Sequence, residues 1–489
     1  PELGSGDSGG SHGGRGGNDQ GSSVPTYGDY RMPVTLGTGG DFTIGGGRIK
    51  ITANALRVEG EIVADGGSFL ANSVGGGAGG SVWLDVGSLS GSGSIRADGG
   101  DVICCGGGGG GGRVAVYYDD ASDFDLNTVD AQGGNSTSGI TLDGAAGTVY
   151  LKDNAAAIGV LRIDNTQQGP GTMSTEIHTN LVEEIHVINA HVTFNRVVTS
   201  TLFIAENAIV DQNAAFSITN LQVDAQTWNQ NTNLNVCNLS IENATWNQVA
   251  PIEAKSLAMT GGTFHHNTNL TVSTADFVVN GGTWNQNVDL NAFQLVLTNV
   301  TWNQVGMLDL ATLTVDGGTV TVDGDLHVSN SVQFAGLNLI QNGELTLPTT
   351  DLVVDGWTYT LNRAETWNLL TVTNGGLITH LTEVDALDLT VNNMNIGAGS
   401  SVDLTGLGLP ELGSGDSGGS HGGRGGNDQG SSVATYGDYQ MPVTLGTGGD
   451  LTRGGGRIRI TANTLHLDGP IVADGGSFLV NSVGGGAGG

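Results

Sequence analysis

Apolar residues recur along residues 185–405 at a spacing that few folds can accommodate. Six segments of the form apolar-x-apolar begin 18 residues apart, with a single interval of 20. A coil of this length cannot bury its own apolar face, so successive coils must stack to build a continuous core. The segments begin at Leu221, Leu239, Leu257, Phe277, Leu295 and Leu313.

The motif Thr-Trp-Asn-Gln occurs four times within these coils. Parallel strands stacked in register place equivalent residues about 4.8 Å apart, so we predict an aromatic ladder beside an asparagine ladder. Phe264 and Val320 replace the tryptophan in two coils, which favours an interior column. A surface platform for sugar rings remains the alternative. The predicted ladder residues are Trp228, Trp246, Phe264, Trp284, Trp302, Asn229, Asn247, Asn285 and Asn303.

Residues 48–155 carry strands at a wider period, separated by runs of glycine. Strands beginning at Ile49, Val82, Val114 and Val149 start 33, 32 and 35 residues apart, and each follows a glycine-rich run. This spacing indicates one coil per period, with the glycine run always at the same corner. Ordering such a run costs entropy, so flexible loops are an alternative. Recurrence at one corner favours glycine segments that hydrogen-bond side by side.

The first 80 residues return at the other end of the sequence. Residues 1–80 and 410–489 align without a gap at an offset of 409, and 69 of the 80 positions are identical. The differences are mild, such as Lys50 to Arg459 and Val58 to Leu467. This pattern is typical of drift between tandem copies, and we expect the native chain to run on in both directions.

These patterns predict the fold class and divide the chain into four segments. Helical periodicity is nearly absent, whereas alternation with a period of two is frequent. We therefore predict an all-β chain folded as a right-handed parallel β-helix, or β-solenoid, with glycine-rich loops and a tandem 409-residue repeat. The parts are a Gly/Ser/Asp-rich insertion (1–47), wide coils (48–184), narrow coils of about 18 residues (185–409) and the start of the next repeat (410–489).

The glycine strings resemble the Gly-rich parallel β-helix repeats of very large microbial cell-surface and filament proteins. The resemblance covers residues 1–150 and 390–489, whereas the narrow coils are similar only in general terms to pectin-lyase-like β-helices. It implies a surface location, an adhesin-like character and no defined activity. The strings are residues 76–84, 110–118, 398–406 and 418–426.

Composition and charge exclude several classes of function. Apolar residues make up 37% of the chain, which is enough to bury a core despite 85 glycines. The net charge is −32 and only three residues are lysines, so nucleic acid is not an expected partner. The sequence has no run of eighteen apolar residues, so we expect no membrane span in it.

The sequence does not indicate a complete group of catalytic residues. Residues 6–10 match the nucleophile motif of chymotrypsin-like proteases, but a triad also needs a positioned histidine and aspartate. Polysaccharide lyases with a β-helix fold are the main enzymatic alternative, and they use calcium-binding acids with a basic residue. Residues 197–362 hold one lysine and no arginine. We therefore expect no enzyme, although a single non-repeating cleft with a basic residue would favour one.

Metal sites and disulfides are not strongly indicated. Cys104, Cys105 and Cys237 give no disulfide framework, so small buried residues are favoured and a vicinal or inter-chain bridge is the alternative. His265 and His266 are too few for a metal site. We expect no cofactor, although acids in glycine loops keep calcium as an alternative. Those acids are Asp7, Asp19, Asp29 and Asp41.

Taken as a sequence, the chain predicts a structural and extracellular role. We expect a subunit of a filament, stalk or matrix fibre that associates with itself end to end, because an open solenoid end exposes unpaired strand edges. A cell-surface adhesin that binds glycans is the alternative. A repeated aromatic or acidic patch on one surface would favour that alternative.

Overall fold

The structure, a computed structural model, confirms the prediction of an all-β chain. Strands make up 50% of the residues and helix 1%. Within the described residues the helical structure is one turn, η1 (Leu126–Thr128), and no helix there could span a membrane. The structure describes all residues except 1–4, 20, 70–73, 104, 138, 140–141, 383–386 and 478–483.

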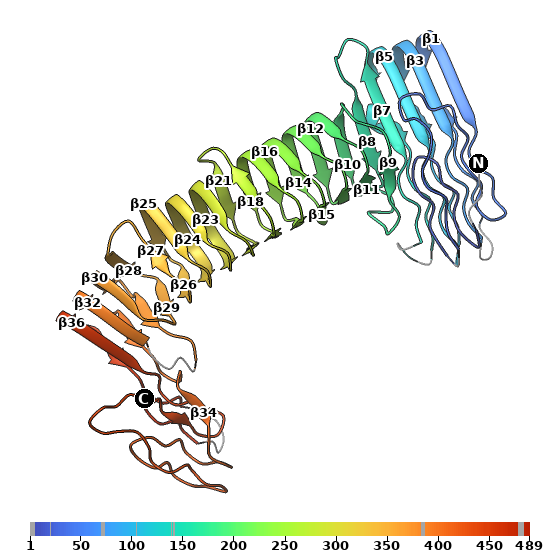
Figure 1. Cartoon of the computed structure of the whole chain (residues 1–489). Coiled ribbons are helices and arrows are strands. Elements are labelled where there is room, and N and C mark those ends of the chain that lie inside the picture. The colour runs from blue at the N-terminus through green and yellow to red at the C-terminus, as the bar shows by residue number, and fades with distance from the viewer. Residues whose placement is uncertain are drawn as a thin grey trace. The chain divides into compact units, whose positions relative to one another are not determined.

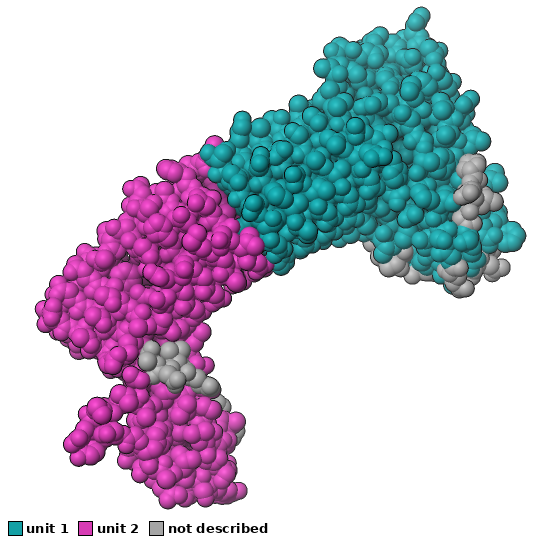
Figure 2. All heavy atoms as spheres, in the orientation of Figure 1, with its two compact units in different colours: residues 1–273 teal, residues 274–489 magenta. Residues whose placement is uncertain are grey.

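The chain divides into two compact units, residues 1–273 and residues 274–489 (Figure 2). The division falls inside the narrow-coil segment expected at 185–409. In each unit most strands run parallel to their neighbours (Figure 1).

Wide coils form the first part of residues 1–273. Their strands are β1 (Arg48–Arg57), β2 (Glu61–Val63), β3 (Ser81–Gly91), β4 (Ser94–Arg96), β5 (Arg113–Phe124), β6 (Val129–Asp130) and β7 (Thr148–Asp153). Strands β1, β3, β5 and β7 pair in parallel, so that Ile49, Val82, Val114 and Val149 form one column. Strands β2, β4 and β6 form a second sheet. Residues that lie opposite each other in these paired strands are thus separated by the expected period of 32 to 35 residues in the sequence.

Narrow coils complete the first unit, and they begin at Val160, ahead of the boundary expected at residue 185. Their strands are β8 (Val160–Asp164), β9 (Thr175–Ile177), β10 (Glu184–Ile188), β11 (His191–Phe194), β12 (Val198–Glu206), β13 (Ile209–Gln212), β14 (Phe216–Asp224), β15 (Thr227–Gln230), β16 (Leu234–Glu242), β17 (Thr245–Gln248), β18 (Ile252–Thr260), β19 (Thr263–His266) and β20 (Leu270–Val272). From β10 to β20 each strand pairs with the strand two further along, so Leu221 lies opposite Leu239 and Trp228 opposite Trp246. Two parallel stacks therefore alternate along the chain.

One strand pair departs from the expected parallel arrangement. Strands β7 and β8 are antiparallel, with Tyr150 opposite Leu161. Few residues separate them, and so short a connection reverses the chain, whereas a return to a parallel strand needs a longer crossover. The antiparallel pair lies where the wide coils give way to the narrow coils.

Strands of the second unit follow the same plan. They are β21 (Phe277–Asn280), β22 (Thr283–Gln286), β23 (Leu290–Gln304), β24 (Leu308–Val322), β25 (Leu326–Ala335), β26 (Asn338–Gln341), β27 (Leu345–Thr346), β28 (Asp351–Asp355), β29 (Thr358–Leu361), β30 (Glu365–Thr373), β31 (Leu377–Thr379), β32 (Leu387–Ile396), β33 (Ser401–Asp403), β34 (Leu409–Glu411), β35 (Thr447–Gly448), β36 (Ile458–Leu467) and β37 (Ile471–Val472). After the insertion at 410–456 the chain resumes on the same sheets, because β36 pairs with β32 and β37 with β33. The long insertion therefore interrupts the stack without ending it.

Local sequence explains these coils. Along β14 the side chains alternate between buried and exposed, as expected for a strand with one face toward the core. Between the stacked strands the chain turns at asparagines with a left-handed backbone, such as Asn189, Asn207 and Asn243, with φ of 48°, 45° and 49°. Asparagine tolerates this conformation better than most residues. The pairing pattern is compatible with a β-solenoid.

The interior ladder and candidate functional surfaces

The aromatic residues of the Thr-Trp-Asn-Gln motif lie in the interior. In the first unit Trp228 and Trp246 stack with ring centroids 5.0 Å apart and planes 5° apart, and Phe264 follows at 5.9 Å. In the second unit Trp284 and Trp302 stack at 5.0 Å and 1°. All five side chains are 0% exposed, so their ring faces are closed to a sugar. The surface-platform alternative is therefore wrong for these residues.

A column of buried glutamines accompanies the aromatic column. Gln230 donates a hydrogen bond from Nε2 to the Ala250 carbonyl at 2.8 Å, in the turn of the next coil. Its Oε1 accepts from the indole Nε1 of Trp246 at 3.4 Å, and Gln286 accepts likewise from Trp302 at 3.2 Å. A buried amide needs such partners to offset its lost hydration. Each glutamine thus bonds its own coil to the following one.

Two coils lack this indole partner. The residue sixteen positions after Gln248 is Phe264, and the one sixteen positions after Gln304 is Val320, and neither can donate a hydrogen bond. The Oε1 atoms of Gln248 and Gln304 are buried without a hydrogen-bond partner among the described residues. An unsatisfied buried acceptor costs roughly 1–3 kcal/mol. The interior ladder therefore has two identifiable weak points.

The predicted asparagines lie at the half-buried outer side of the same strands. Asn247 donates from Nδ2 to Oδ1 of Asn229 at 2.8 Å, and Asn229 donates to Asp211 at 2.8 Å. In the second unit Asn303 donates to Asn285 at 2.9 Å. Such amide ladders are favoured where identical side chains stack in register. They add side-chain bonds between coils but form no pocket.

Glycine runs pack against one another in the first unit. We call residues 5–17, 37–47, 75–80, 106–112 and 142–147 the glycine layer. Gly14 donates its N–H to the Gly111 carbonyl at 2.8 Å, and Gly110 donates to Gly10 at 2.8 Å. Bonds of this kind recur across the layer, so its backbone groups are paired although it forms few regular strands. The runs are therefore packed segments, and the flexible-loop alternative is wrong.

Only glycine fits at the centre of this layer. A Cβ atom on Gly107 would overlap the Gly17 carbonyl oxygen, and one on Gly109 would overlap that of Gly77. The obstructing atoms belong to backbone, which cannot rotate away. The close approach of the segments, rather than turn geometry, thus explains the glycine content of these runs.

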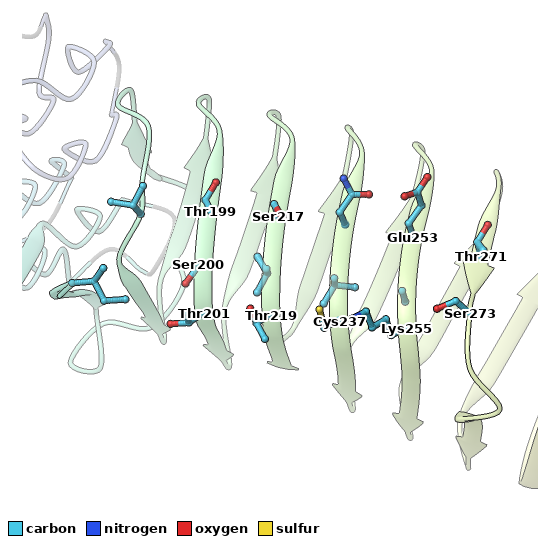
Figure 3. Close-up of a pocket in the computed structure, with 16 residues that line it drawn as sticks. Thr199, Ser200, Thr201, Ser217, Thr219, Cys237, Glu253, Lys255, Thr271 and Ser273 are labelled. Carbon is cyan, nitrogen blue, oxygen red and sulfur yellow. The ribbon is translucent and has the colours of Figure 1, made fainter. Parts of the chain in front are cut away.

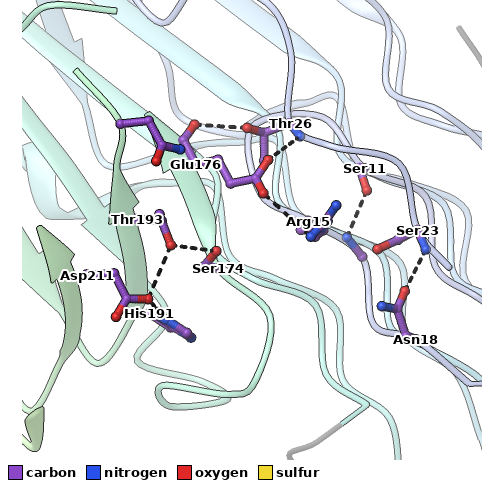
Figure 4. Close-up of polar contacts among 12 residues, drawn as sticks. Ser11, Arg15, Asn18, Ser23, Thr26, Ser174, Glu176, His191, Thr193 and Asp211 are labelled. Atoms are coloured by element: carbon purple, nitrogen blue, oxygen red, sulfur yellow. Dashed lines mark hydrogen bonds and ion pairs between the residues drawn. The ribbon is translucent and has the colours of Figure 1, made fainter. Parts of the chain in front are cut away.

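Polar side chains attach the insertion at 1–47 to the rest of the first unit (Figure 4). Glu176 accepts a hydrogen bond from the Thr26 N–H at 3.2 Å and lies 3.5 Å from Arg15. Arg31 forms an ion pair with Glu183, whose side chain is 2% exposed. These contacts, together with the glycine layer, bind the insertion along its length.

An open groove of about 550 Å³ runs across the outer face of β12, β14, β16, β18 and β20 (Figure 3). Its outward side chains are mostly small and polar, and they repeat from coil to coil. Lys255 is the one basic residue that lines it, beside Glu253 and the free, half-buried Cys237. The outward residues form two columns: Thr199, Ser217, Asn235, Glu253 and Thr271, then Thr201, Thr219, Cys237, Lys255 and Ser273.

Several titratable groups of the wide coils are buried. Burial raises the pKa of Asp98 to about 7, although its Oδ1 accepts the Gln132 N–H at 2.7 Å. Burial also raises the pKa of Asp130, one coil further along. His12 lies buried between the Gly79 carbonyl and the Thr35 hydroxyl, and burial lowers its pKa to about 3. Burial thus disfavours the charged form of each of these groups.

In the described parts of the chain, no three His, Cys, Asp or Glu residues are grouped closely enough to hold a metal ion. Of the acids considered for calcium, Asp29 accepts the N–H groups of Arg31 and Met32 at 2.7 and 3.1 Å, a turn contact. His266 is fully buried, and burial lowers its pKa to about 4.

The cysteines differ from one another. Cys105 is disulfide-bonded, which supports the bridged alternative over a buried thiol. Cys104 lies outside the described residues, and Cys237 is free. Cys105 directly precedes the glycine run at 106–112.

Comparison of the chain with protein-family models, curated proteins and solved structures finds no match. Sequence reasoning missed the groove and the indole partners of the glutamines. The groove had a signal, because Thr201, Thr219 and Lys255 share one position of the 18-residue period. The indole partners of the glutamines had no such signal, because each bond joins the glutamine column to the tryptophan column, at two different positions of the period.

Proposed function

We propose that the chain is a structural subunit of an extracellular filament, stalk or matrix fibre, built as a right-handed parallel β-helix. The observation that carries the proposal is the interior bonding of each narrow coil to the next. Gln230, for example, is bonded both to a turn carbonyl and to an indole of the following coil. Such bonds make a stack of coils cooperative along its axis, as a fibre element requires.

Surface features agree with this role. A net charge of −32 keeps neighbouring fibres apart and soluble. Outer amide ladders, such as Asn229 with Asn247, strengthen the stack without creating a binding site. The insertion at 1–47 recurs at 410–456, so a filament of these repeats would carry one glycine-rich projection per repeat.

Electron microscopy or fibre diffraction of the native assembly tests the proposal. About four wide and about twelve narrow coils per repeat, at ~4.8 Å each, give an axial period of roughly 75–85 Å. A continuous rod with this period supports the filament. Separate globular particles on flexible linkers, or particles that never associate, would contradict it.

A glycan-binding adhesin is the second candidate, and the groove is the observation that favours it. Hydroxyl and amide groups stand there in columns one strand apart, which suits hydrogen bonding along an extended polyhydroxyl chain. Calorimetry with neutral and acidic oligosaccharides tests this function. Binding that is lost in Thr219→Val and kept in Thr346→Val, which lies outside the groove, would favour the adhesin. If no oligosaccharide binds, the adhesin is contradicted and the filament remains as the proposed function.

A further inference from the structure

Arg113, the first residue of β5, carries a buried positive charge whose bonded partners are neutral. The residue is 4% exposed. Its Nε donates a hydrogen bond to the Tyr27 carbonyl at 2.8 Å, and its Nη1 donates to the Thr148 hydroxyl at 3.0 Å. Both acceptors lack a charge, and no described acid forms an ion pair with this guanidinium. Arginines are rarely buried to this degree without a charged partner.

Other arginines of the first unit do have such partners. Arg31 is paired with the carboxylate of Glu183. The Nε of Arg96 lies 2.8 Å from the carboxylate of Asp65. Both of these arginines are more exposed than Arg113, so water also solvates them. The most deeply buried of the three guanidinium groups is therefore the one without an acid.

Burial leaves the charge of Arg113 poorly compensated. Loss of water around the guanidinium lowers the pKa of Arg113 to about 10, and the Asp29 carboxylate opposes this shift only in part. Asp29 lies beyond ion-pair distance, and its Oδ1 accepts the N–H groups of Arg31 and Met32. A buried charge of this kind is stabilised when an anion takes the place of the lost water.

A cavity of about 270 Å³ borders the guanidinium. We call it the Arg113 cavity. Its wall consists of residues 26–28 and Tyr30 from the insertion, Arg113 from β5, and residues 176–179 from β9 and the turn after it. This volume is far more than one water molecule needs. The cavity shares no lining residue with the groove on β12 to β20.

Arg113 has hydrogen-bond donors left for a ligand in this cavity. A guanidinium carries five N–H donors, and the described residues accept two of those of Arg113. The donors that remain include those on Nη2. The acid in the same wall, Glu176, is already engaged by the Thr26 N–H at 3.2 Å and by Arg15 at 3.5 Å (Figure 4). The wall therefore offers an anion one unpaired positive charge.

We propose that the Arg113 cavity binds the carboxylate group of a small organic acid or of an acidic sugar residue. A carboxylate matches the planar guanidinium, because its two oxygens can accept parallel hydrogen bonds from Nη1 and Nη2. This binding site goes beyond the proposed structural role and does not depend on it. A filament with the expected axial period would stand whether or not the cavity binds a ligand.

Ligand-observed NMR titration of the full-length chain tests the site with four probes. Acetate and galacturonate should bind, and galactose, which has the sugar ring without the acid, should not. Galacturonate that binds at least about tenfold more tightly than acetate would assign the site to acidic sugars, and equal affinities would assign it to free carboxylates. Inorganic sulfate that binds where neither carboxylate does would overturn the proposal, as would the absence of any binding.

Substitution of the arginine locates the ligand. Arg113→Gln removes the charge and should weaken carboxylate binding at least about tenfold. Arg57→Gln is the matched control, because Arg57 is exposed, is paired with Glu59 and lies outside the cavity, and its affinity should equal that of the parent chain. Thr219→Val changes the groove and should also leave binding unchanged. Binding that survives Arg113→Gln but is lost in Thr219→Val would place the carboxylate in the groove and overturn the proposal.

A second pair of variants keeps the test decisive if Arg113→Gln does not fold. Thr179 is an exposed residue of the cavity wall, so both Thr179→Glu and Thr179→Gln should fold. The two side chains have nearly the same size, but the glutamate repels a carboxylate ligand. Affinity in Thr179→Glu should be at least about tenfold below that in Thr179→Gln at low ionic strength. Equal affinities in the two variants would show that the carboxylate binds elsewhere.

Discussion

A tryptophan of one coil donates a hydrogen bond from its indole to a glutamine of the coil before it, as Trp246 does to Gln230. Trp246→Phe removes the indole N–H and leaves Oε1 of Gln230 buried without that donor. We expect the free energy of unfolding to fall by about 1–3 kcal/mol, measured by denaturant titration. A loss equal to that of an exposed substitution such as Val249→Ala would contradict the role of this bond.

The opposite change should repair a weak point. Phe264→Trp offers an indole N–H to Oε1 of Gln248, which has no partner now. We expect the unfolding free energy to rise by about 1 kcal/mol, because the new ring continues the stack with Trp246. Phe264→Leu, which adds no donor, is the matched control and should not stabilise. A destabilised Phe264→Trp would show that the interior has no room for the larger ring.

Asp98 predicts a dependence on pH with a definite sign. Burial holds its pKa at about 7 in the folded chain, against an ordinary value of 3.8 for an aspartate. Between these values the folded state binds more protons, so this residue lowers stability progressively as pH rises, and the full cost is present above pH 7. Asp98→Asn should therefore raise the melting temperature more at pH 8 than at pH 4. An equal shift at both values would contradict the burial of a titrating carboxyl.

At the scale of elements, the glycine layer behaves as one packed unit despite its irregular backbone. A methyl group on Gly109 would overlap the Gly77 carbonyl oxygen, and one on Gly485 would meet nothing within 4 Å. We expect Gly109→Ala to cost about 3 kcal/mol or more and Gly485→Ala to cost little. Thermal unfolding of both variants measures the difference. If both variants lose little stability, the glycine runs can move apart to accommodate a methyl group, which would contradict their tight packing.

Sequence periodicity was enough to predict the all-β class and the positions of the coils. The interval between Val82 and Val114 is visible in the sequence because the strands that contain them repeat one motif. The antiparallel pair β7 and β8 was not predictable, since it follows from the length of one connection. The period does place Thr201, Thr219 and Lys255 in one outward column, but outward polar residues on a strand look alike whether the surface is flat or hollow, so the groove itself was not predicted.

On the scale of the whole molecule, the groove supplies the cleft with a basic residue that an enzyme would require. The lining on either side of Lys255 nevertheless repeats from coil to coil. We expect the purified chain to cleave no acidic glycan, with Lys255→Met unchanged from the parent, as measured by release of unsaturated ends. Turnover that Lys255→Met abolishes and Thr346→Val leaves intact would replace the filament proposal with a lyase.

Low-complexity stretches are usually treated as tolerant linkers, chosen for tags, cuts and insertions. In this chain the run at 106–112 has the opposite property, because its carbonyl and amide groups face neighbouring backbones at contact distance. A random replacement there should be selected against more strongly than one at an ordinary apolar core position. Variation among tandem copies should therefore spare the glycines themselves, and none of the eleven differences between residues 1–80 and 410–489 replaces a glycine.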